Sequence, residues 1–429
     1  MAVAIVACSG PAQAQTLPDA VSRAIATYPE IQAAVATRRA ATEAISQARG
    51  GFFPSVDANL GYGRERTENP GTRPSGDVTL NRTEADVTLS QMLFDGGAVR
   101  SQVRIQASRS DSTAYELADT AQTIGLRAAQ AYLDVLRLRS SIEIARGNVA
   151  THQRTLEQVS LLADRGAGRR SEAQQAEARL ALAQSTLTGL RRQLEQAEAA
   201  YRHLVGISPQ QLHKPAAPFE RLPQKEPAAR EEALAGHPSI KAAQAELEAA
   251  QADRDSARAR LAPRVTVDLG ATQNQDVDGV RGTDADRIAM LRMRYNLFRG
   301  GADSARIRET VARIDRAHAT LGRVRNDVER EVRTSWESFQ TDREQLRYLQ
   351  AHADASAAVV EAYRAQFKLG QRSLLDVLNA ENEHFTARRS FVDGEYAVIG
   401  GSYRILASTG RLLEALGVAL PPEARVEKQ

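Results

Sequence analysis

The sequence has one cysteine, Cys8, among its 429 residues. A single thiol excludes a disulfide framework within the chain and a zinc site built from several cysteines. Aromatic residues make up only 5% of the chain and charged residues 25%, which argues against a large globular core and favours long helices packed through small residues. No apolar run approaches the roughly 20 residues that a membrane-spanning helix needs. A membrane crossing by this chain would therefore need β-strands in a closed barrel.

Motifs that carry chemistry are also absent. The seven histidines form no zinc-binding pair of the metalloprotease type, and the sequence has no phosphate-binding lysine loop and no nucleophile elbow. His152 interrupts an apolar helical pattern, and we interpret it as a packing irregularity rather than a ligand. The 56 basic residues nearly balance the 53 acidic residues, so the net charge gives little reason to expect a nucleic-acid partner. We expect no enzyme, no metal site and no cofactor.

The N-terminus is interpreted as the remnant of a secretory signal over residues 1–14. Ala12-Gln13-Ala14 has the small-x-small pattern of a signal-peptidase site, so Gln15 is expected to begin the mature chain. An alternative is a lipoprotein signal, in which Cys8 at the end of Ile5-Val6-Ala7-Cys8 carries a lipid. A disordered, uncleaved tail is the third interpretation. Either kind of signal predicts export.

The chain contains a long internal repeat. Tyr28-Pro29-Glu30-Ile31 corresponds to His237-Pro238-Ser239-Ile240, an offset of 209 positions, and Leu93-Phe94-Asp95-Gly96-Gly97 corresponds to Leu297-Phe298-Arg299-Gly300-Gly301, an offset of 204. A proline-rich linker over residues 205–228 separates the copies. We therefore predict a first repeat over residues 15–204, a second over residues 229–416 and a C-terminal tail over residues 417–429.

Each repeat is predicted to read helix, two strands, long helix, break and long helix. The helix-to-strand switches are at Pro54 and Pro263, followed by strands within residues 54–94 and 263–298 whose side chains alternate between apolar and polar. Such alternation is typical of a membrane barrel with a lipid-facing outside, and equally of a small soluble antiparallel sheet. Helical hairpins are predicted over residues 97–204 and 301–416, with breaks at Gly166 and Gly168 in the first and at Gly370 in the second.

The long helices favour the membrane interpretation. Apolar residues, mainly Ala and Leu, recur at alternating steps of four and three, as in the series Leu117, Ala121, Ile124, Ala128, Ala131, Val135, Leu138, Ile142, Ala145 and Val149. This spacing is a heptad seam that lets neighbouring helices approach closely. A helix over residues 97–165 would span on the order of 100 Å. Four strands are too few to close a barrel, so two copies would have to supply eight strands or three copies twelve.

These features together resemble the TolC-like outer-membrane channels of efflux pumps and type I secretion systems. The resemblance extends over nearly the whole mature chain and includes the hairpin segment from Gly370 to Ala380. It implies a homotrimer with a twelve-stranded β-barrel in the outer membrane and a long α-helical coiled-coil barrel in the periplasm. It also implies two partners, a periplasmic adaptor and an inner-membrane transporter of the ABC or RND type. The two Leu-Phe-x-Gly-Gly motifs are more similar to the type I secretion branch.

The resemblance also implies a gate at the hairpin tips. Asp376 falls where the family has a ring of carboxylates at the narrowest point, and Asn379 replaces a second carboxylate. Arg372 falls where an arginine ties the second hairpin to the first, with Ser171 and Glu172 as its expected partners. The family's supporting tyrosine is Phe367 here, which cannot donate a hydrogen bond, so we expect a weaker latch.

We therefore predict an exit duct that passively conducts an exported protein or small molecule across the periplasm and outer membrane. Type I protein secretion is the favoured role and multidrug efflux the alternative. A periplasmic adaptor scaffold is less favoured, because adaptors usually carry one hairpin and this chain has two. A soluble coiled-coil structural protein is a further competitor, which would not need detergent for its extraction.

Overall fold

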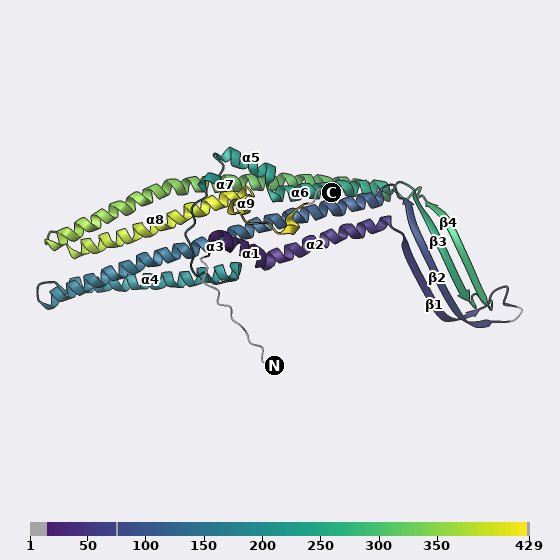
Figure 1. Ribbon diagram of the computed structural model, residues 1–429, viewed down its shortest axis with the longest axis horizontal. Coiled ribbons are helices and arrows are strands. Elements are labelled where there is room, and N and C mark those ends of the chain that lie inside the picture. The colour runs from purple at the N-terminus through teal and green to yellow at the C-terminus, as the bar shows by residue number, and fades with distance from the viewer. Residues whose placement is uncertain (1–14, 74–75, 427–429) are drawn as a thin grey trace. The chain divides into compact units, whose positions relative to one another are not determined.

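The computed structural model describes residues 15–73 and 76–426 (Figure 1). The predicted signal over residues 1–14, including Cys8, lies outside the described residues. The chain divides into two compact units. One unit comprises the chain up to Ala36, Ala114–Lys241 and the chain from Arg323 onward, and the other comprises Thr37–Thr113 and Ala242–Gly322. Each unit therefore combines segments of both repeats.

The duplication predicted from the sequence is confirmed by matching elements. The first repeat contains α1 (Leu17–Thr27), α2 (Pro29–Arg49), β1 (Ser55–Thr67), β2 (Val78–Phe94), α3 (Ala98–Asp164) and α4 (Arg170–Val205). The second contains α5 (Glu226–Gly236), α6 (Pro238–Ala259), β3 (Arg264–Gln275), β4 (Thr283–Arg294), α7 (Ala302–Lys368) and α8 (Leu374–Ser408). Helices α3 and α7 have 67 residues each, and α4 and α8 have 36 and 35.

The element boundaries correct two details of the prediction. The single helix expected before the strands of each repeat is two helices in the first repeat, because Tyr28 precedes a proline and takes an extended conformation with ψ 130°. His237 breaks the second repeat before Pro238 in the same way. Strand β4 ends at Arg294, before the end of the strand region predicted over residues 263–298. The chain after α8 also forms α9 (Leu412–Leu416) and a short 3-10 turn at Pro422–Ala424.

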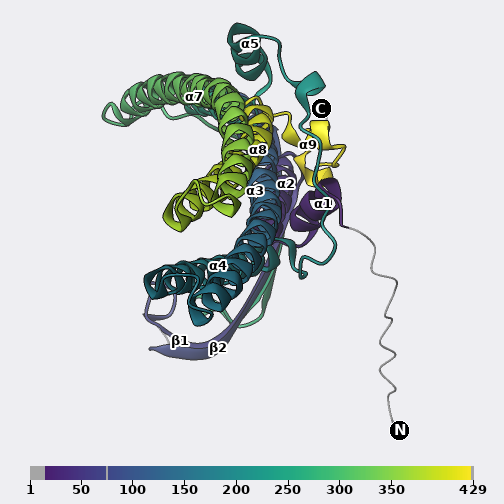
Figure 2. The same ribbon diagram turned by 90° about the vertical axis from the view of Figure 1, so that its left-hand side faces the viewer.

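The heptad seams form the cores of the hairpins in the first unit. Nine of the ten seam residues predicted in α3 are buried, all except Val149. Tyr132 and Tyr201 are fully buried where α3 and α4 meet α1. Helices α4 and α8 contact one another, and Figure 2 shows the α3–α4 and α7–α8 hairpins as two neighbouring helix pairs. Burial of small and branched side chains therefore holds the two hairpins of this unit together.

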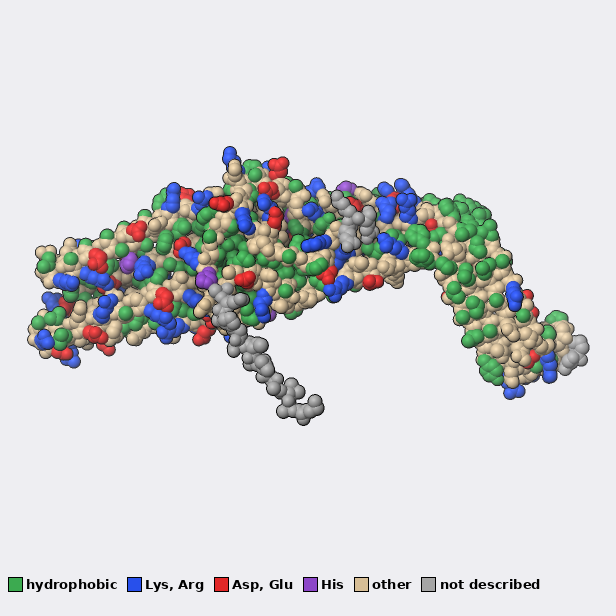
Figure 3. All heavy atoms as spheres, viewed as in Figure 1, with side chains coloured by type: hydrophobic (Ala, Val, Ile, Leu, Met, Phe, Trp, Pro, Cys, Tyr) green, Lys and Arg blue, Asp and Glu red, His purple; other side chains and the backbone are tan. Residues whose placement is uncertain are grey.

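The second unit contains one antiparallel sheet in the order β1-β2-β3-β4. Within the described residues, β1 pairs with β2 and β4 pairs with β3, so both outer strands have a free edge in the single chain. Apolar side chains are exposed along the sheet, including Leu60 at 86%, Tyr62 at 79% and Leu291 at 68% (Figure 3). No helix in the described ranges combines the length and the hydrophobicity that a membrane crossing requires.

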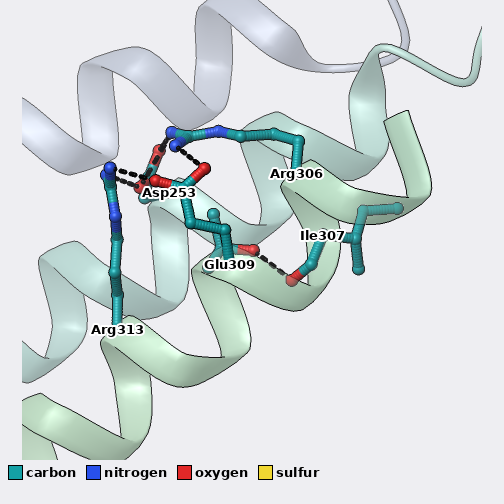
Figure 4. A network of polar contacts seen from close by, with 6 residues as sticks. Asp253, Arg306, Ile307, Glu309 and Arg313 are labelled. Atoms are coloured by element: carbon teal, nitrogen blue, oxygen red, sulfur yellow. Dashed lines mark hydrogen bonds and ion pairs between the residues drawn. The ribbon is translucent and has the colours of Figure 1, made fainter. Parts of the chain in front are cut away.

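A charged network joins α6 to α7 in the second unit (Figure 4). Asp253 accepts hydrogen bonds from Arg306 at 3.0 and 3.2 Å and from Arg313 at 3.1 Å. Glu309 bonds both arginines, at 2.9 Å and 2.5 Å. Asp253 of α6, shared between two guanidinium groups of α7, fixes the register of the two helices more firmly than one exposed pair would, while Glu309 holds both arginines from within α7.

Candidate gate at the tips of the helical hairpins

The two hairpin turns have the same backbone geometry. Gly166 and Gly370 have φ of +74° and +72°, the left-handed conformation that glycine adopts without a steric cost. In each turn the residue after the glycine donates to a helix carbonyl five positions back, Ala167 to Leu162 and Gln371 to Gln366, both at 2.9 Å. These are the bonds of a Schellman helix end. The helix breaks predicted at Gly166 and Gly370 are thus equivalent turns, and they are separated by 204 positions, one of the two offsets of the internal repeat.

Gly168 contributes to its turn by close approach. A Cβ atom at this position would lie 3.1 Å from the Leu162 Cβ and 3.2 Å from the Ala163 nitrogen. The corresponding position of the second turn is occupied by Arg372. The first turn is therefore packed against its own helix, whereas the second presents a cation.

The two returning helices begin differently. Ser373 caps α8, because its Oγ accepts from the Asp376 nitrogen at 3.2 Å and donates to the Asp376 carboxylate at 2.9 Å. Asp376 also accepts from the Ser373 nitrogen, which completes a capping box. Arg169 occupies the equivalent position before α4 and makes no side-chain cap. Asp376 therefore stabilises the N-terminus of α8 within each chain, in addition to the gate role expected from the family resemblance.

Arg372 contacts residues of its own hairpin. Its guanidinium lies 4.2 Å from the centre of the Tyr363 ring, donates to Gln366 Oε1 at 3.0 Å and lies 3.9 Å from Asp376. Tyr363, which the sequence analysis did not single out, supports the arginine by a cation–π contact. The expected bonds from Arg372 to Ser171 and Glu172, in the first turn of α4, remain a prediction.

Apolar contacts join the two tips. Val159 of α3 clusters with Leu374 and Leu378 of α8, and Phe367 and Ala173 pack against this cluster. Phe367 thus lies at the contact between the hairpins, and it packs there as an apolar side chain in place of the tyrosine that the family resemblance implies. The described tip is held together by hydrophobic burial, with its charged groups placed around that cluster.

Asn379 makes a polar contact between the hairpins. Its Oδ1 accepts from Arg179 of α4 at 2.8 Å. The asparagine therefore joins α8 to α4 without adding a second negative charge beside Asp376. Asn379 was expected from the sequence as a departure from the family pattern, whereas its partner Arg179 was not expected.

A buried carboxylate paired with a partly exposed arginine lies further along the hairpins. Glu381 is 6% exposed and accepts two hydrogen bonds from Arg364 of α7, at 3.0 and 3.1 Å. Its other oxygen lies 3.7 Å from Nδ1 of His152, which is 2% exposed, and neither atom has a hydrogen-bond partner. Burial lowers the pKa of His152, while the Glu381 carboxylate acts in the opposite direction. His152 is therefore a buried, neutral residue of α3 that faces Glu381 of α8.

The helix-to-strand switches lie where they were predicted. Pro54 immediately precedes β1, after a 3-10 turn at Gly50–Phe52, and Pro263 immediately precedes β3. Because proline lacks an amide hydrogen, neither residue could continue the preceding helix. Among the described residues, no cluster of three or more His, Cys, Asp or Glu side chains could hold a metal ion.

The comparisons with known proteins assign the chain to a family. The family described as outer membrane efflux protein matches residues 20–207 and 229–411. The two matched segments correspond to the two repeats and cover most of the sequence. The chain belongs to this family of TolC-like outer-membrane channels.

Relatives in the family have both efflux and secretion names. The outer membrane efflux protein BepC of Brucella suis is 27% identical over 405 residues, covering 94% of this chain and 86% of BepC. The alkaline protease secretion protein AprF of Pseudomonas aeruginosa is 24% identical over 412 residues, covering 92% and 85%. The outer membrane protein TolC of Escherichia coli is 24% identical over 420 residues, covering 94% and 83%.

Solved structures share the fold. The outer-membrane channel OprN superposes with a TM-score of 0.80 at 23% identity, covering 92% of this chain and 90% of OprN. The CmeC outer-membrane channel of Campylobacter jejuni gives 0.80 at 16% identity, covering 92% and 86%. The chain is therefore an outer-membrane transport protein with a large periplasmic helical portion, in a family of channels rather than enzymes.

Proposed function

We propose that the chain is the exit duct of a tripartite export system and that its principal role is type I protein secretion. Three copies would pool their sheets into a twelve-stranded barrel and their hairpins into a tunnel. A periplasmic adaptor and an inner-membrane ABC transporter would recruit this trimer, and the exported protein would pass through it. The free-edged sheet with its exposed apolar side chains is the observation that carries the proposal.

The sheet supports assembly for two reasons. All 12 residues of β4 are exposed in the single chain, and its outer edge has unpaired backbone groups within the described residues. Such groups cost several kcal/mol each in lipid unless another strand pairs with them. A neighbouring copy's β1 offers an edge of comparable length, 13 residues against 12.

The secretion role is supported by sequence similarity. The Leu-Phe-Asp-Gly-Gly and Leu-Phe-Arg-Gly-Gly motifs favour the secretion branch, and AprF and the proteases secretion protein PrtF of Dickeya chrysanthemi are relatives named for secretion. Small-molecule efflux is the second candidate, favoured by BepC and by the pyoverdine export protein OpmQ of P. aeruginosa.

A chromosomal deletion of the gene distinguishes secretion from efflux. Loss of a secreted protein with unchanged drug susceptibility supports secretion, and the reverse result supports efflux.

The predicted trimer is tested by an experiment that does not depend on which substrate is exported. The protein extracted in mild detergent is expected to have the mass of three chains by light scattering corrected for detergent. A stable monomer that needs no detergent would contradict the barrel, whatever the deletion shows.

The gate is tested by conductance in planar bilayers. Asp376→Asn removes the charge but keeps an oxygen that can accept from Ser373, so it separates the ring charge from the helix cap. We expect lower cation selectivity and loss of block by trivalent cations with little change in conductance. Arg372→Ser is expected to raise conductance while selectivity stays cationic. Unchanged conductance in Arg372→Ser would contradict the latch, and unchanged selectivity in Asp376→Asn would contradict the carboxylate ring.

A further inference from the structure

Gln15 occupies a socket built by three separate segments of the first unit. Its backbone nitrogen donates to the Gln211 carbonyl at 3.0 Å. Its carbonyl lies 2.8 Å from the Tyr132 hydroxyl, whose single proton is shared with the His213 carbonyl at 2.7 Å. Its side-chain oxygen accepts from the Tyr201 hydroxyl at 3.0 Å, and its side-chain nitrogen donates to the Ser208 carbonyl at 3.3 Å. All four polar groups of one residue are therefore paired with α3, α4 and the linker.

The polar groups of the socket match the side-chain amide of glutamine. Tyr132 and Tyr201 are both 0% exposed, and their hydroxyls point at Gln15 from the core. Burial raises the pKa of Tyr201 to about 12, so its hydroxyl stays a hydrogen-bond donor to the amide oxygen. A glutamate would place a carboxylate oxygen against the Ser208 carbonyl, where two acceptors would face each other. Only an amide both donates to Ser208 and accepts from Tyr201.

Gln15 is also the residue expected to become the N-terminus after cleavage behind Ala14. An N-terminal glutamine is chemically unstable. Its free α-amine attacks the side-chain Cδ, a new N–Cδ bond closes a five-membered lactam, and the amide nitrogen leaves as ammonia. The product, pyroglutamate, is 17 Da lighter and has no positive charge.

We propose that the socket formed by Tyr132, Tyr201 and the linker carbonyls holds the processed N-terminal glutamine open and protects it from this cyclisation. Ring closure would pull Cδ toward the α-nitrogen and break the bonds to Tyr201 and Ser208 together. The Gln211 carbonyl, which accepts from the Gln15 nitrogen, would hold that nitrogen in place and away from Cδ.

The test follows the mass of the processed protein over time. Purified trimer at pH 8 and the same protein unfolded in urea at pH 8 are incubated in parallel, and N-terminal peptides are weighed by mass spectrometry. We expect a peptide beginning at Gln15 in both samples. The 17 Da loss should accumulate at least tenfold more slowly in the folded protein. Equal rates in the two samples would overturn the proposal, as would a lipid on Cys8 or a chain cleaved elsewhere.

Two tyrosine variants assign the protection to the socket. Tyr201→Phe removes the hydroxyl that holds the amide oxygen and should bring the rate in the folded protein most of the way to the unfolded rate. Tyr403→Phe is the matched control, because Tyr403 is also buried but donates to the Ala216 carbonyl instead. Unchanged protection in a folded Tyr201→Phe trimer would overturn the assignment. If that variant does not fold, the folded-against-unfolded comparison of the unaltered protein still decides the proposal.

Discussion

Replacing Arg364 with methionine isolates the contribution of the buried pair between α7 and α8. The substitution leaves the Glu381 carboxylate buried beside a neutral histidine with no cation bonded to it. Removing one partner of a buried pair costs about 3–5 kcal/mol. Because the Arg364 side chain is 38% exposed and water reaches it, we expect a smaller cost than this range, about 2–3 kcal/mol.

A second substitution is expected to reverse the effect. In Arg364→Met/Glu381→Gln the buried charge is gone, and the new amide can donate to Nδ1 of His152, which has no partner now. Satisfying that nitrogen while removing the charge should bring the local stability to within about 1 kcal/mol of the unaltered protein. The two substitutions should therefore be strongly non-additive.

Hydrogen exchange of the first turns of α8 is the appropriate measurement, since it reports local opening free energy in an intact trimer. A loss of 2–3 kcal/mol corresponds to exchange about 30- to 150-fold faster, at 1.36 kcal/mol per factor of ten. Peptides from the sheet should be unaffected.

Glu361→Gln is the matched control. Glu361 also pairs with Arg364, at 3.3 Å, but its side chain is 77% exposed. Its loss should cost less than about 0.5 kcal/mol. The reasoning is refuted if Arg364→Met is no worse than Glu361→Gln, or if adding Glu381→Gln makes the arginine variant worse.

Three further predictions concern the hairpins of the first unit. Burial lowers the pKa of His152, so as the pH falls the unfolded chain binds a proton at this histidine before the folded chain does. Local stability should therefore decrease below about pH 6.5, by up to about 1.4 kcal/mol per pH unit. Hydrogen exchange at pH 7.5 and 5.5 measures this decrease, and His152→Gln should make the stability less dependent on pH. Arg169→Ser should stabilise α4 by about 0.5–1 kcal/mol, because Glu172 is already in place to complete a capping box. Unchanged hydrogen exchange in the first turn of α4 would contradict this prediction. Gly370→Ala should cost about 1–2 kcal/mol by urea unfolding because its φ is +72°, whereas Gly189→Ala, at an open helical position, should be neutral or stabilising.

The architecture could be predicted from the sequence because its signals are local and occur twice. Period-two alternation after Pro54 and Pro263 predicted strands, and the Ala and Leu seams predicted the helices and their buried faces. The helix break at Tyr28 was also predictable, since it follows from the proline next to it. Gly166 and Gly370 occupy equivalent turns, one in each repeat, because the left-handed conformation of these turns favours glycine.

The burial and the hydrogen-bond partners of the polar side chains at the tip and in the N-terminal socket could be found only from the tertiary structure. Glu177 and Glu381 occupy corresponding places in the repeats, yet the first is exposed and the second is buried against Arg364 and His152. The sequence pattern is nearly the same for both, so only the packing of α3 and α7 around α8 distinguishes them. Gln15 likewise gained its partners from segments about 120 and 190 residues away in the sequence. Local pattern determines which residues form helices and strands, whereas the environment of a polar side chain depends on the segments that surround it, and those are set by the packing of the whole chain.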